Sequence, residues 1–342
     1  MLQSGFFDLT DRFAKLDQLG DPLKALNAVV DWPVFVPILA KGLKKEKRSN
    51  AGRPVSFEPL LMFKVLILQS LYNLADGQTE FQIRDRFTFL RFLGLTPESR
   101  IPDEKTIWLF RESVKVRGLH DELFQTFTAF LETQGFEAKR GTVIDARIVE
   151  VPKQRNTRSE NATIKEGSMP ADWEKHTAKK AQKDIEARWT QKNGKNHYGY
   201  KNHIAIDVKH KFIRAHDVTA ANVHDSQRFE PLLDRRNSDP AVYADSAYRS
   251  EEAERLLKRK RFKSRVHHRS WAGQTLTRRQ QQQNRARSRI RARVEHVFGH
   301  QVKAMRQTLV RGIGLARIRT RIVLTNLAYN MSRLAQLRPL CA

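Results

Sequence analysis

Cysteine is almost absent from this chain of 342 residues, whose one cysteine, Cys341, lies next to the C-terminus. A single thiol cannot form an internal disulfide, and it cannot supply the ligands of a zinc ribbon. The sequence therefore argues against a disulfide-stabilised fold and favours a protein of a reducing compartment.

Long hydrophobic runs are absent as well. The most apolar stretch, Pro59 to Ala75, is interrupted by Lys64, Gln69 and Asn73, so it is too short and too polar to span a bilayer and predicts a buried core helix. The N-terminal segment has no basic region followed by an apolar one, so no signal peptide is expected. We therefore expect a soluble, cytoplasmic protein with no membrane partner.

Acidic residues are nearly missing from the last 88 residues. From Arg255 to Ala342 there are 23 Lys or Arg residues and one acid, Glu295, so this segment carries +22 of the net charge of +26. The first 254 residues, with 40 basic and 36 acidic side chains, are nearly balanced. Such one-sided charge repels itself unless a polyanion neutralises it, which makes nucleic acid the leading partner. Apolar residues at helical spacing argue against the alternative, a solvated basic tail.

Residues 1–138 predict a domain built of helices, and the chain length suggests about two domains. Lys44–Pro54 has the composition of a basic linker. Thr79 with Gln82 predicts a capping box, and Asp103 predicts the start of a later helix. Several short helices with tight turns are compatible with a helix-turn-helix that binds DNA ends. A plain packing or dimerisation bundle fits equally well.

Residues 139–342 predict a second domain with strands. A run rich in Val and Ile over 142–151 predicts a buried strand. The polar stretch 153–196 predicts an insertion or mobile loop, in which Trp173 and Trp189 suggest contact with a partner. The remaining elements expected are strands at 200–208, 211–218, 241–244 and 262–266, a helix capped by Asp225, a helix at 251–260, and basic helices at 284–305 and 315–337. This order is typical of an α/β core of the ribonuclease-H kind.

Three acidic residues stand where an ordinary surface role does not explain them. Asp145 interrupts a strand of Val and Ile, where a charge is costly unless it is paired or bound to metal. Asp245 follows a short strand, at the carboxyl end where open α/β sheets bind ligands. Glu295 is the lone acid of the basic segment and lies on a predicted helix.

These acids predict a site for Mg²⁺ or Mn²⁺. Cutting a phosphodiester requires up to about 20 kcal/mol of barrier reduction. Two Mg²⁺ ions roughly 3.5–4 Å apart, held by carboxylates, are a common solution, so two ions per site are expected. Zinc is the alternative, since His296 and His300 have suitable spacing on one helix. No third ligand and no HExxH pattern accompany them, however.

Other acids leave plainer alternatives open. Glu295 is also placed for an i,i+4 salt bridge with Arg291, which contributes about 0.3–0.5 kcal/mol. That pairing does not explain why every other acid is missing from the segment. Glu150 is a weaker fourth candidate on the first strand. Asp207 and Asp217 lie near strand ends, where solvated positions are expected.

The second part of the chain resembles bacterial insertion-sequence transposases of the IS-five type, within the IS-four superfamily of DDE transposases. Five motifs carry the resemblance: KNGKNHYGYKNHIAIDVKHKFIR, VHDSQ, YADSAYRS, RSRIRARVEHVFG and TNLAYNMSRL. The resemblance covers nearly all of residues 142–334. The resemblance implies a ribonuclease-H-like catalytic domain over 139–342 and an all-α N-terminal domain over 1–138.

The resemblance also implies the roles of individual residues. Asp145 in VIDAR, Asp245 in YADSAYR and Glu295 in RARVEHVFG match the catalytic, metal-binding triad. Arg291 and Glu295 match the superfamily's helix signature, whose Tyr position holds Ser288 here and whose Lys is met one place late by Lys303. The residues expected to bind DNA are Arg289, Arg291, Arg293, Lys303, Tyr248 and Arg249.

The function implied is DNA transposition. Such an enzyme binds terminal inverted repeats, cuts the transposon ends by metal-dependent hydrolysis and joins their 3′-OH groups to target DNA. The expected protein is a homodimer on double-stranded DNA, associated with the bacterial nucleoid. Two rivals stay open: a metal-dependent nuclease without strand transfer, and a non-catalytic DNA-binding protein derived from a transposase. The presence of all three acids argues against the second rival.

Overall fold

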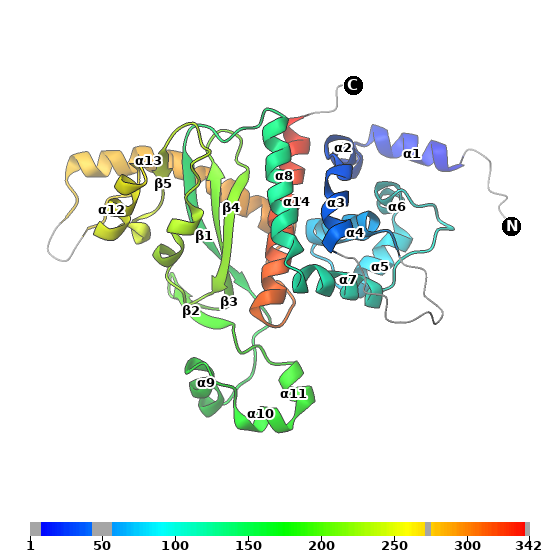
Figure 1. Cartoon of the computed structure of the whole chain (residues 1–342), viewed down its shortest axis with the longest axis horizontal. Coiled ribbons are helices and arrows are strands. Elements are labelled where there is room, and N and C mark those ends of the chain that lie inside the picture. The colour runs from blue at the N-terminus through cyan, green and yellow to red at the C-terminus, as the bar shows by residue number, and fades with distance from the viewer. Residues whose placement is uncertain (1–7, 43–56, 271–274, 339–342) are drawn as a thin grey trace. The chain divides into compact units, whose positions relative to one another are not determined.

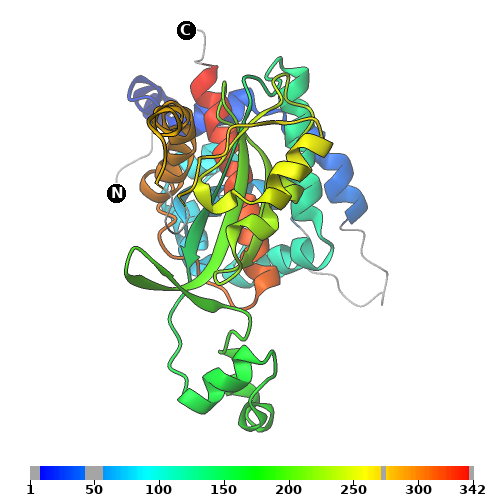
Figure 2. The same cartoon turned by 90° about the vertical axis from the view of Figure 1, so that its left-hand side faces the viewer.

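The computed structural model describes residues 8–42, 57–270 and 275–338 (Figures 1 and 2). The predicted linker at Lys44–Pro54 and the cysteine at 341 lie outside the described residues. By its internal contacts the chain divides into two compact units. The first comprises residues 1–123 with 327–342, and the second comprises residues 124–326.

Every described element that precedes the first strand is helical, as the sequence predicts. Asp103 caps its helix as expected, because its Oδ1 accepts a hydrogen bond of 2.7 Å from the amide of Thr106. Aromatic rings of the first unit, among them Phe35 and Phe63 with centroids 4.8 Å apart, form its core. The helices are α1 (Asp8–Gln18), α2 (Pro22–Val29), η1 (Trp32–Phe35), α3 (Val36–Gly42), α4 (Pro59–Tyr72), α5 (Asp76–Asp85), α6 (Phe87–Leu93), α7 (Glu104–Val116) and α8 (Leu119–Thr133).

The most apolar segment of the sequence forms α4, a core helix whose residues from Met62 to Gln69 are buried except Lys64. The expectation of a core helix is therefore confirmed. Within the described ranges no single helix is long and apolar enough to cross a membrane. One bent pair, Pro22–Val29 with Trp32–Lys41 at 65°, meets that test by length and composition.

The predicted capping box at Thr79 is wrong. Helix α5 begins at Asp76 with Ala75 as its N-cap, so Thr79 lies buried inside the first turn. Its hydroxyl donates to the carbonyl of Ala75 at 2.8 Å. Gln78 completes the cap instead, since its Oε1 accepts from the amide of Ala75 at 3.2 Å. Helix α5 therefore begins earlier in the chain than the pattern of polar residues predicts.

The second unit is built on a six-stranded mixed sheet, which confirms the predicted α/β class. Strands β2, β3, β1, β5 and β6 follow one another in that order, and β4 pairs with β3. The pairs β1–β3, β2–β3 and β3–β4 are antiparallel, whereas β1–β5 and β5–β6 are parallel. The strands are β1 (Thr142–Glu150), β2 (Arg188–Lys192), β3 (Lys195–Asp207), β4 (Ile213–Ala220), β5 (Ala241–Tyr243) and β6 (Lys263–Ser264).

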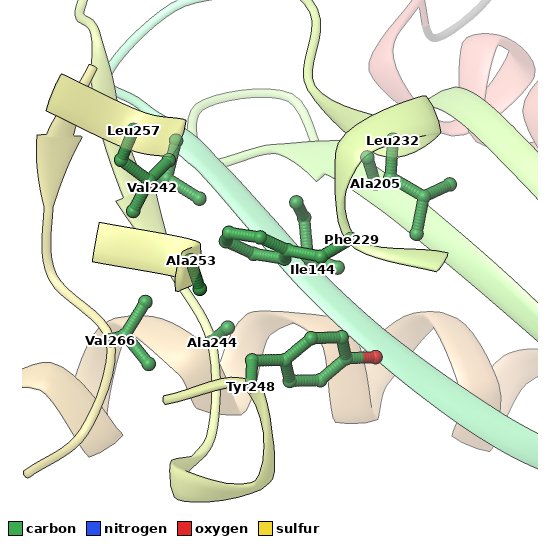
Figure 3. Close-up of a cluster of buried hydrophobic side chains, with 10 residues drawn as sticks. All are labelled: Ile144, Ala205, Phe229, Leu232, Val242, Ala244, Tyr248, Ala253, Leu257 and Val266. Carbon is green, nitrogen blue, oxygen red and sulfur yellow. The ribbon is translucent and has the colours of Figure 1, made fainter. Parts of the chain in front are cut away.

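Helices cover the two faces of this sheet. One face packs its apolar side chains against η3 (Glu230–Leu232), η4 (Ser246–Tyr248) and α12 (Glu251–Arg259), in the cluster that includes Ile144 and Tyr248 (Figure 3). The other face lies under α13 (Arg278–Lys303) and α14 (Leu315–Leu337). Since successive side chains of a strand point to opposite faces, the neighbour of Ile144, Asp145, points to the side of α13.

The polar stretch 153–196 has more structure than the predicted loop. It contains α9 (Arg158–Lys165), α10 (Ala171–Lys175), α11 (Thr177–Ala181) and strand β2. Trp173 is fully buried there, and its indole N–H donates to Glu160 at 2.7 Å. This tryptophan therefore serves as a small local core rather than as a surface for a partner. Trp189 is about half exposed and lies against Tyr198, with ring centroids 5.2 Å apart.

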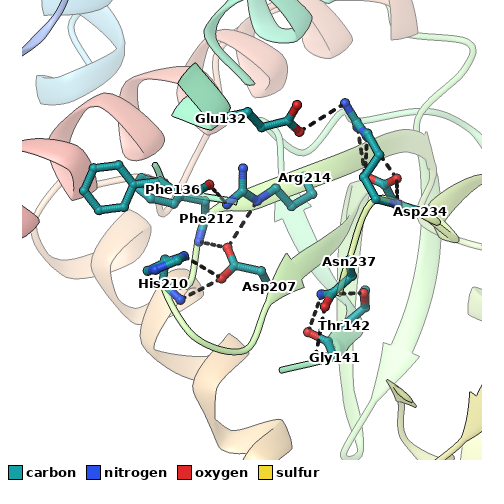
Figure 4. Close-up of polar contacts among 11 residues, drawn as sticks. Glu132, Phe136, Gly141, Thr142, Asp207, His210, Phe212, Arg214, Asp234 and Asn237 are labelled. Atoms are coloured by element: carbon teal, nitrogen blue, oxygen red, sulfur yellow. Dashed lines mark hydrogen bonds and ion pairs between the residues drawn. The ribbon is translucent and has the colours of Figure 1, made fainter. Parts of the chain in front are cut away.

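The prediction that Asp207 is solvated is wrong. Its carboxylate is fully buried and accepts from the amide of His210 at 2.6 Å and of Phe212 at 3.1 Å (Figure 4). Arg214, also buried, donates its Nε to the same carboxylate at 3.2 Å and its Nη2 to the carbonyl of Phe136 at 2.6 Å. The turn between β3 and β4 folds its amides inward, so the acid becomes the centre of the turn.

The helix expected from Asp225 is replaced by two 3₁₀ turns, η2 (Asp225–Arg228) and η3. The N-cap is His224, and Asp225 instead accepts from Lys201 Nζ at 2.8 Å. The carboxylate of Asp225, which the sequence predicted to cap a helix, thus forms an ion pair with a lysine of β3 instead.

Candidate functional site

One cleft of about 800 Å³ in the second unit is lined by all three predicted acids. Asp145 lies in β1, Asp245 lies two residues after the end of β5, and Glu295 lies on α13. The parallel register pairs Thr142 with Val242 and Val143 with Tyr243, so continuing it by two residues places Asp145 beside Asp245. Helix α13 contacts both strands, which brings Glu295 to the same place.

Asp145 is a buried carboxylate in an electrostatically crowded position. Its side chain is 11% exposed, Oδ1 accepts from the amide of Ala146 at 2.8 Å, and Oδ2 accepts from Arg291 Nη1 at 2.7 Å. Burial raises the pKa of Asp145 to about 6, although the Arg291 guanidinium acts to lower it. The nearby carboxylates of Asp245 and Glu295 raise this pKa further. Burial and the two neighbouring acids therefore outweigh the favourable contact of Asp145 with Arg291.

This raised pKa gives a stability prediction. The folded protein holds the Asp145 proton more tightly than the unfolded chain, so this group's stabilising contribution is greatest below about pH 4 and is lost as the pH rises through about 6. Asp145→Asn, which mimics the protonated acid, is expected to raise the free energy of unfolding at pH 8 by up to about 3 kcal/mol, since one pKa unit corresponds to about 1.4 kcal/mol.

Urea denaturation in EDTA at pH 4.5 and pH 8 measures this effect. The gain of the variant over the wild type is expected to be larger at pH 8 than at pH 4.5. A gain that is equal at both values, or larger at the acidic one, contradicts the proposed electrostatic strain at Asp145.

The other two acids are more accessible. Asp245 is half-buried and caps η4, because its Oδ1 accepts from the amide of Ala247 at 2.9 Å. Glu295 is exposed on α13. The alternative i,i+4 salt bridge of Glu295 with Arg291 is absent from the described residues, since Arg291 turns to Asp145 instead. Glu295 therefore stays available to a ligand in the cleft.

Three carboxylates face one cleft, and carboxylate oxygens are the ligands that a hard divalent cation takes. The three carboxylates do not converge on one point, however: among the described residues no three His, Cys, Asp or Glu side chains are arranged to hold a metal ion. The zinc alternative at His296 and His300 likewise gains no third described ligand. Arg291 competes with a cation for Oδ2 of Asp145, to which it donates at 2.7 Å.

The residues predicted to bind DNA divide into two groups. Lys303 is exposed and lines the cleft, Arg291 lines it while pairing with Asp145, and Arg289 is exposed on α13. Arg291 and Lys303 therefore bring positive charge into the cleft that the acids line. Lys303 and Arg289 are accessible to a phosphate in the described structure, whereas Arg291 is engaged by Asp145.

The second group is committed to the fold. Arg293 donates to the carbonyl of Val208 at 2.5 Å, and Arg249 donates to the carbonyl of Val266 at 3.0 Å. Tyr248 is fully buried against Phe229, with ring centroids 5.4 Å apart (Figure 3). Its expected DNA contact is corrected, because a ring in the core cannot reach a strand at the surface.

Four further side chains line the cleft, although the sequence did not predict that they bind DNA: Arg147, Lys192, His197 and Thr308. Arg147 was detectable, since it lies two residues after Asp145 in a strand and so shares its face. Burial lowers the pKa of Arg147 to about 10. Lys192 lies in the stretch 153–196 that the sequence predicted as an insertion and His197 lies directly after it, and no periodic pattern pointed to either residue.

The remaining candidate acids are engaged elsewhere or at the edge of the site. Glu150, the fourth candidate, lines the cleft, and its Oε1 lies 2.5 Å from Nδ1 of His197. Asp217 lies in β4 and pairs with Arg319 at 3.3 Å and Arg228 at 3.5 Å. Glu150 therefore belongs to the cleft, whereas Asp217 is an ion-pair residue.

Fold and cleft together define an α/β protein in which carboxylates from two neighbouring strands and a basic helix face a common opening. The family described as Transposase DDE domain matches residues 137–331, and the Transposase domain (DUF772) matches residues 11–113. This chain belongs to the Transposase DDE domain family, which confirms the transposase family expected from the sequence motifs. The IS-five type within it stays a prediction.

Among solved structures, the chain is similar to the piggyBac transposase in its synaptic complex with hairpin DNA, determined by cryo-electron microscopy. The identity is 10% and the TM-score is 0.41. The similarity covers 92% of this chain and 75% of the piggyBac chain.

Proposed function

We propose that this protein is a DNA transposase that binds terminal inverted repeats, cleaves the transposon ends with the help of a divalent metal and joins the 3′-OH ends to target DNA. One observation carries the proposal. In a chain of the transposase family, Asp145, Asp245 and Glu295 come from three separate elements and line one cleft. Structural ion pairs do not account for this placement, because among the described residues only Asp145 of the three acids has a basic partner.

We further infer that the core is ribonuclease-H-like. The strand order and directions support this: three antiparallel strands, β1, β3 and β4, are continued by two short parallel strands, β5 and β6. The functional division proposed is 139–342 for catalysis and 1–138 for binding DNA ends, for dimerisation, or for both. A homodimer that pairs two ends at the bacterial nucleoid follows from this proposal.

In the proposed mechanism Asp145, Asp245 and Glu295 would hold two Mg²⁺ or Mn²⁺ ions. The bound metal supplies activation of the attacking oxygen and stabilisation of the leaving one. The burial of Asp145 excludes water and strengthens its attraction for a cation. Arg291, once released from Asp145, is placed to meet the phosphate that enters the cleft. Arg289 and Lys303 hold flanking phosphates, which positions the DNA without specifying its sequence.

The test uses purified protein and labelled DNA that carries the inverted repeats flanking the gene. Cleavage at the repeat ends is expected with Mg²⁺ or Mn²⁺, and pre-cut ends are expected to join to a plasmid. Activity that persists in EDTA, or that returns with Zn²⁺ alone, contradicts the proposed site. Cutting without joining indicates the rival nuclease. Metal-independent binding with no cut product indicates the non-catalytic DNA-binding protein.

A further inference from the structure

The cleft has a basic end as well as an acidic one. Asp145, Asp245 and Glu295 line one part of the cleft, and Arg147, Lys192 and His197 line the same continuous volume, in which the carboxylate of Glu150 contacts His197. The two cationic side chains, Arg147 from β1 and Lys192 from the β2–β3 hairpin, do not come from the basic C-terminal helices on which the charge pattern of the sequence focuses. Positive charge next to a carboxylate site provides a place for an anionic part of the substrate.

Arg147 lacks the partner that a half-buried guanidinium normally has. Its Nη2 donates to the carbonyl of Gln307, and no carboxylate of the described ranges forms an ion pair with it. Removing a charge from water without an opposite charge is unfavourable, so an anion that enters the cleft would offset this cost. The planar guanidinium is suited to phosphate, which it can bind through two parallel N–H donors.

Lys192 is held in the cleft by a rigid hairpin. Asn193 and Gly194, with φ of 51° and 74°, form the two-residue turn that joins β2 to β3, a type of turn that matches the twist of the flanking strands. The amide of Val151 donates to the backbone carbonyl of Tyr198 at 3.2 Å, which ties the hairpin to the end of β1.

Gly199 permits this approach. A Cβ at that position would collide with the carbonyl of Val149 and lie 3.1 Å from the amide of Val151. The hairpin is therefore packed directly on β1. Across the turn, Lys195 pairs with Lys192 in register, is also exposed, and is not among the side chains that line the cleft.

We propose that Arg147 and Lys192 bind a backbone phosphate of the DNA strand adjacent to the phosphate held at the acidic end of the cleft. This proposal rests on the proposed transposase function. Arg147 is then a positioning residue, which fixes the strand so that the bond to be cut lies over Asp145, Asp245 and Glu295. The β2–β3 hairpin is then a second wall of the DNA channel, and Lys192 adds a phosphate contact to those proposed for Arg289 and Lys303 on α13.

The first test measures binding of a pre-cut transposon end in EDTA at several salt concentrations. Each phosphate contact contributes about −0.9 to the slope of log K against log salt for duplex DNA. Lys192→Ala is expected to flatten the slope by up to about one unit, whereas the matched control Lys195→Ala leaves it unchanged. Equal slopes for the two lysine variants overturn the role of Lys192.

The second test locates the phosphate. Single phosphates near the cleavage point are replaced, one at a time, by neutral methylphosphonates. At the phosphate bound by Arg147, wild-type affinity is expected to fall about tenfold, the effect of one charge-assisted hydrogen bond. Arg147→Met is expected to show no further loss at that position, and Arg147→Lys is expected to regain much of the sensitivity.

The measurements distinguish a misfolded variant from a wrong inference, and a wrong inference from a wrong proposed function. Thermal unfolding shows whether Arg147→Met is folded, and the exposed Lys192 provides an independent variant. If no phosphate shows reduced sensitivity in Arg147→Met, the role of Arg147 is overturned. Because both tests measure binding without metal, a protein that cleaves DNA but fails them refutes only this inference. A protein that passes them without ever cleaving refutes only the transposase proposal.

Discussion

Asp145→Asn, Asp245→Asn and Glu295→Gln are each expected to lower the rate of transposon-end cleavage by at least about 10³-fold, equivalent to about 4 kcal/mol of activation free energy. Each variant removes one anionic oxygen donor from the cleft that the three residues share. Substitution by the amide keeps the size of the side chain, so DNA binding is expected to remain within a few-fold of the wild type. Cleavage assays in Mg²⁺ and anisotropy measurements in EDTA separate the two effects.

A matched control is available on α12. Glu252→Gln changes an exposed acid that does not line this cleft, and it is expected to leave cleavage unchanged. If one of the three active-site variants cuts at nearly the wild-type rate, that residue is not a metal ligand. Loss of cleavage together with an equal loss of DNA binding would point instead to a defect in folding or in substrate affinity.

Asp207→Asn is expected to lower the free energy of unfolding by about 3–5 kcal/mol, the cost of removing one partner of a buried ion pair. The substitution leaves the buried guanidinium of Arg214 without its carboxylate. It also weakens the acceptor for the amides of His210 and Phe212, which close the β3–β4 turn (Figure 4). Urea denaturation at neutral pH measures the loss.

Glu132→Gln is the control for this prediction. Glu132 faces Arg236 at 3.6 Å, and both side chains are more than a third exposed. Exposed ion pairs contribute at most about 1 kcal/mol, so the control is expected to lose less than that. A loss of less than about 1 kcal/mol for Asp207→Asn as well would refute the view that this acid holds the turn together.

The expected behaviour of Asp145 links function to stability. Its carboxylate is buried among other acids, and its pKa is raised to about 6 by that burial. Asp145→Asn is therefore expected to abolish cleavage and at the same time to stabilise the fold at pH 8. Opposite effects of one substitution are typical of residues kept for activity at the expense of stability.

The α/β class, the positions of most helices and strands, and the transposase family were predictable from the sequence. Runs of Val and Ile identify β1, and Asp103 identifies the start of α7, because burial and capping act over a few neighbouring residues. The placement of Asp145, Asp245 and Glu295 could also be proposed, since each is an acid in a setting that does not otherwise favour one. Their roles as metal ligands stay a prediction.

The tertiary structure decided the partners of the polar side chains. The sequence predicted a solvated Asp207 and a helix-capping Asp225, yet Asp207 is the buried centre of a turn and Asp225 pairs with Lys201. Arg293 and Arg289 lie on one basic helix, but Arg293 is taken by the carbonyl of Val208. Hydrogen bonds and ion pairs of this kind join residues far apart in the chain, so no local pattern specifies them.

The division has a physical cause. Periodicity, net charge and strand or helix ends depend on short-range sterics and on the burial of apolar groups, and these are written in consecutive residues. Which carboxylate meets which cation depends on strand register and helix packing, for example on the pairing of Val143 with Tyr243 that places Asp145 beside Asp245. The sequence by itself determined an acidic triad within a basic α/β protein. Only the packing of β1, β5, α13 and the β2–β3 hairpin decided that the acids share a cleft with Arg147 and Lys192.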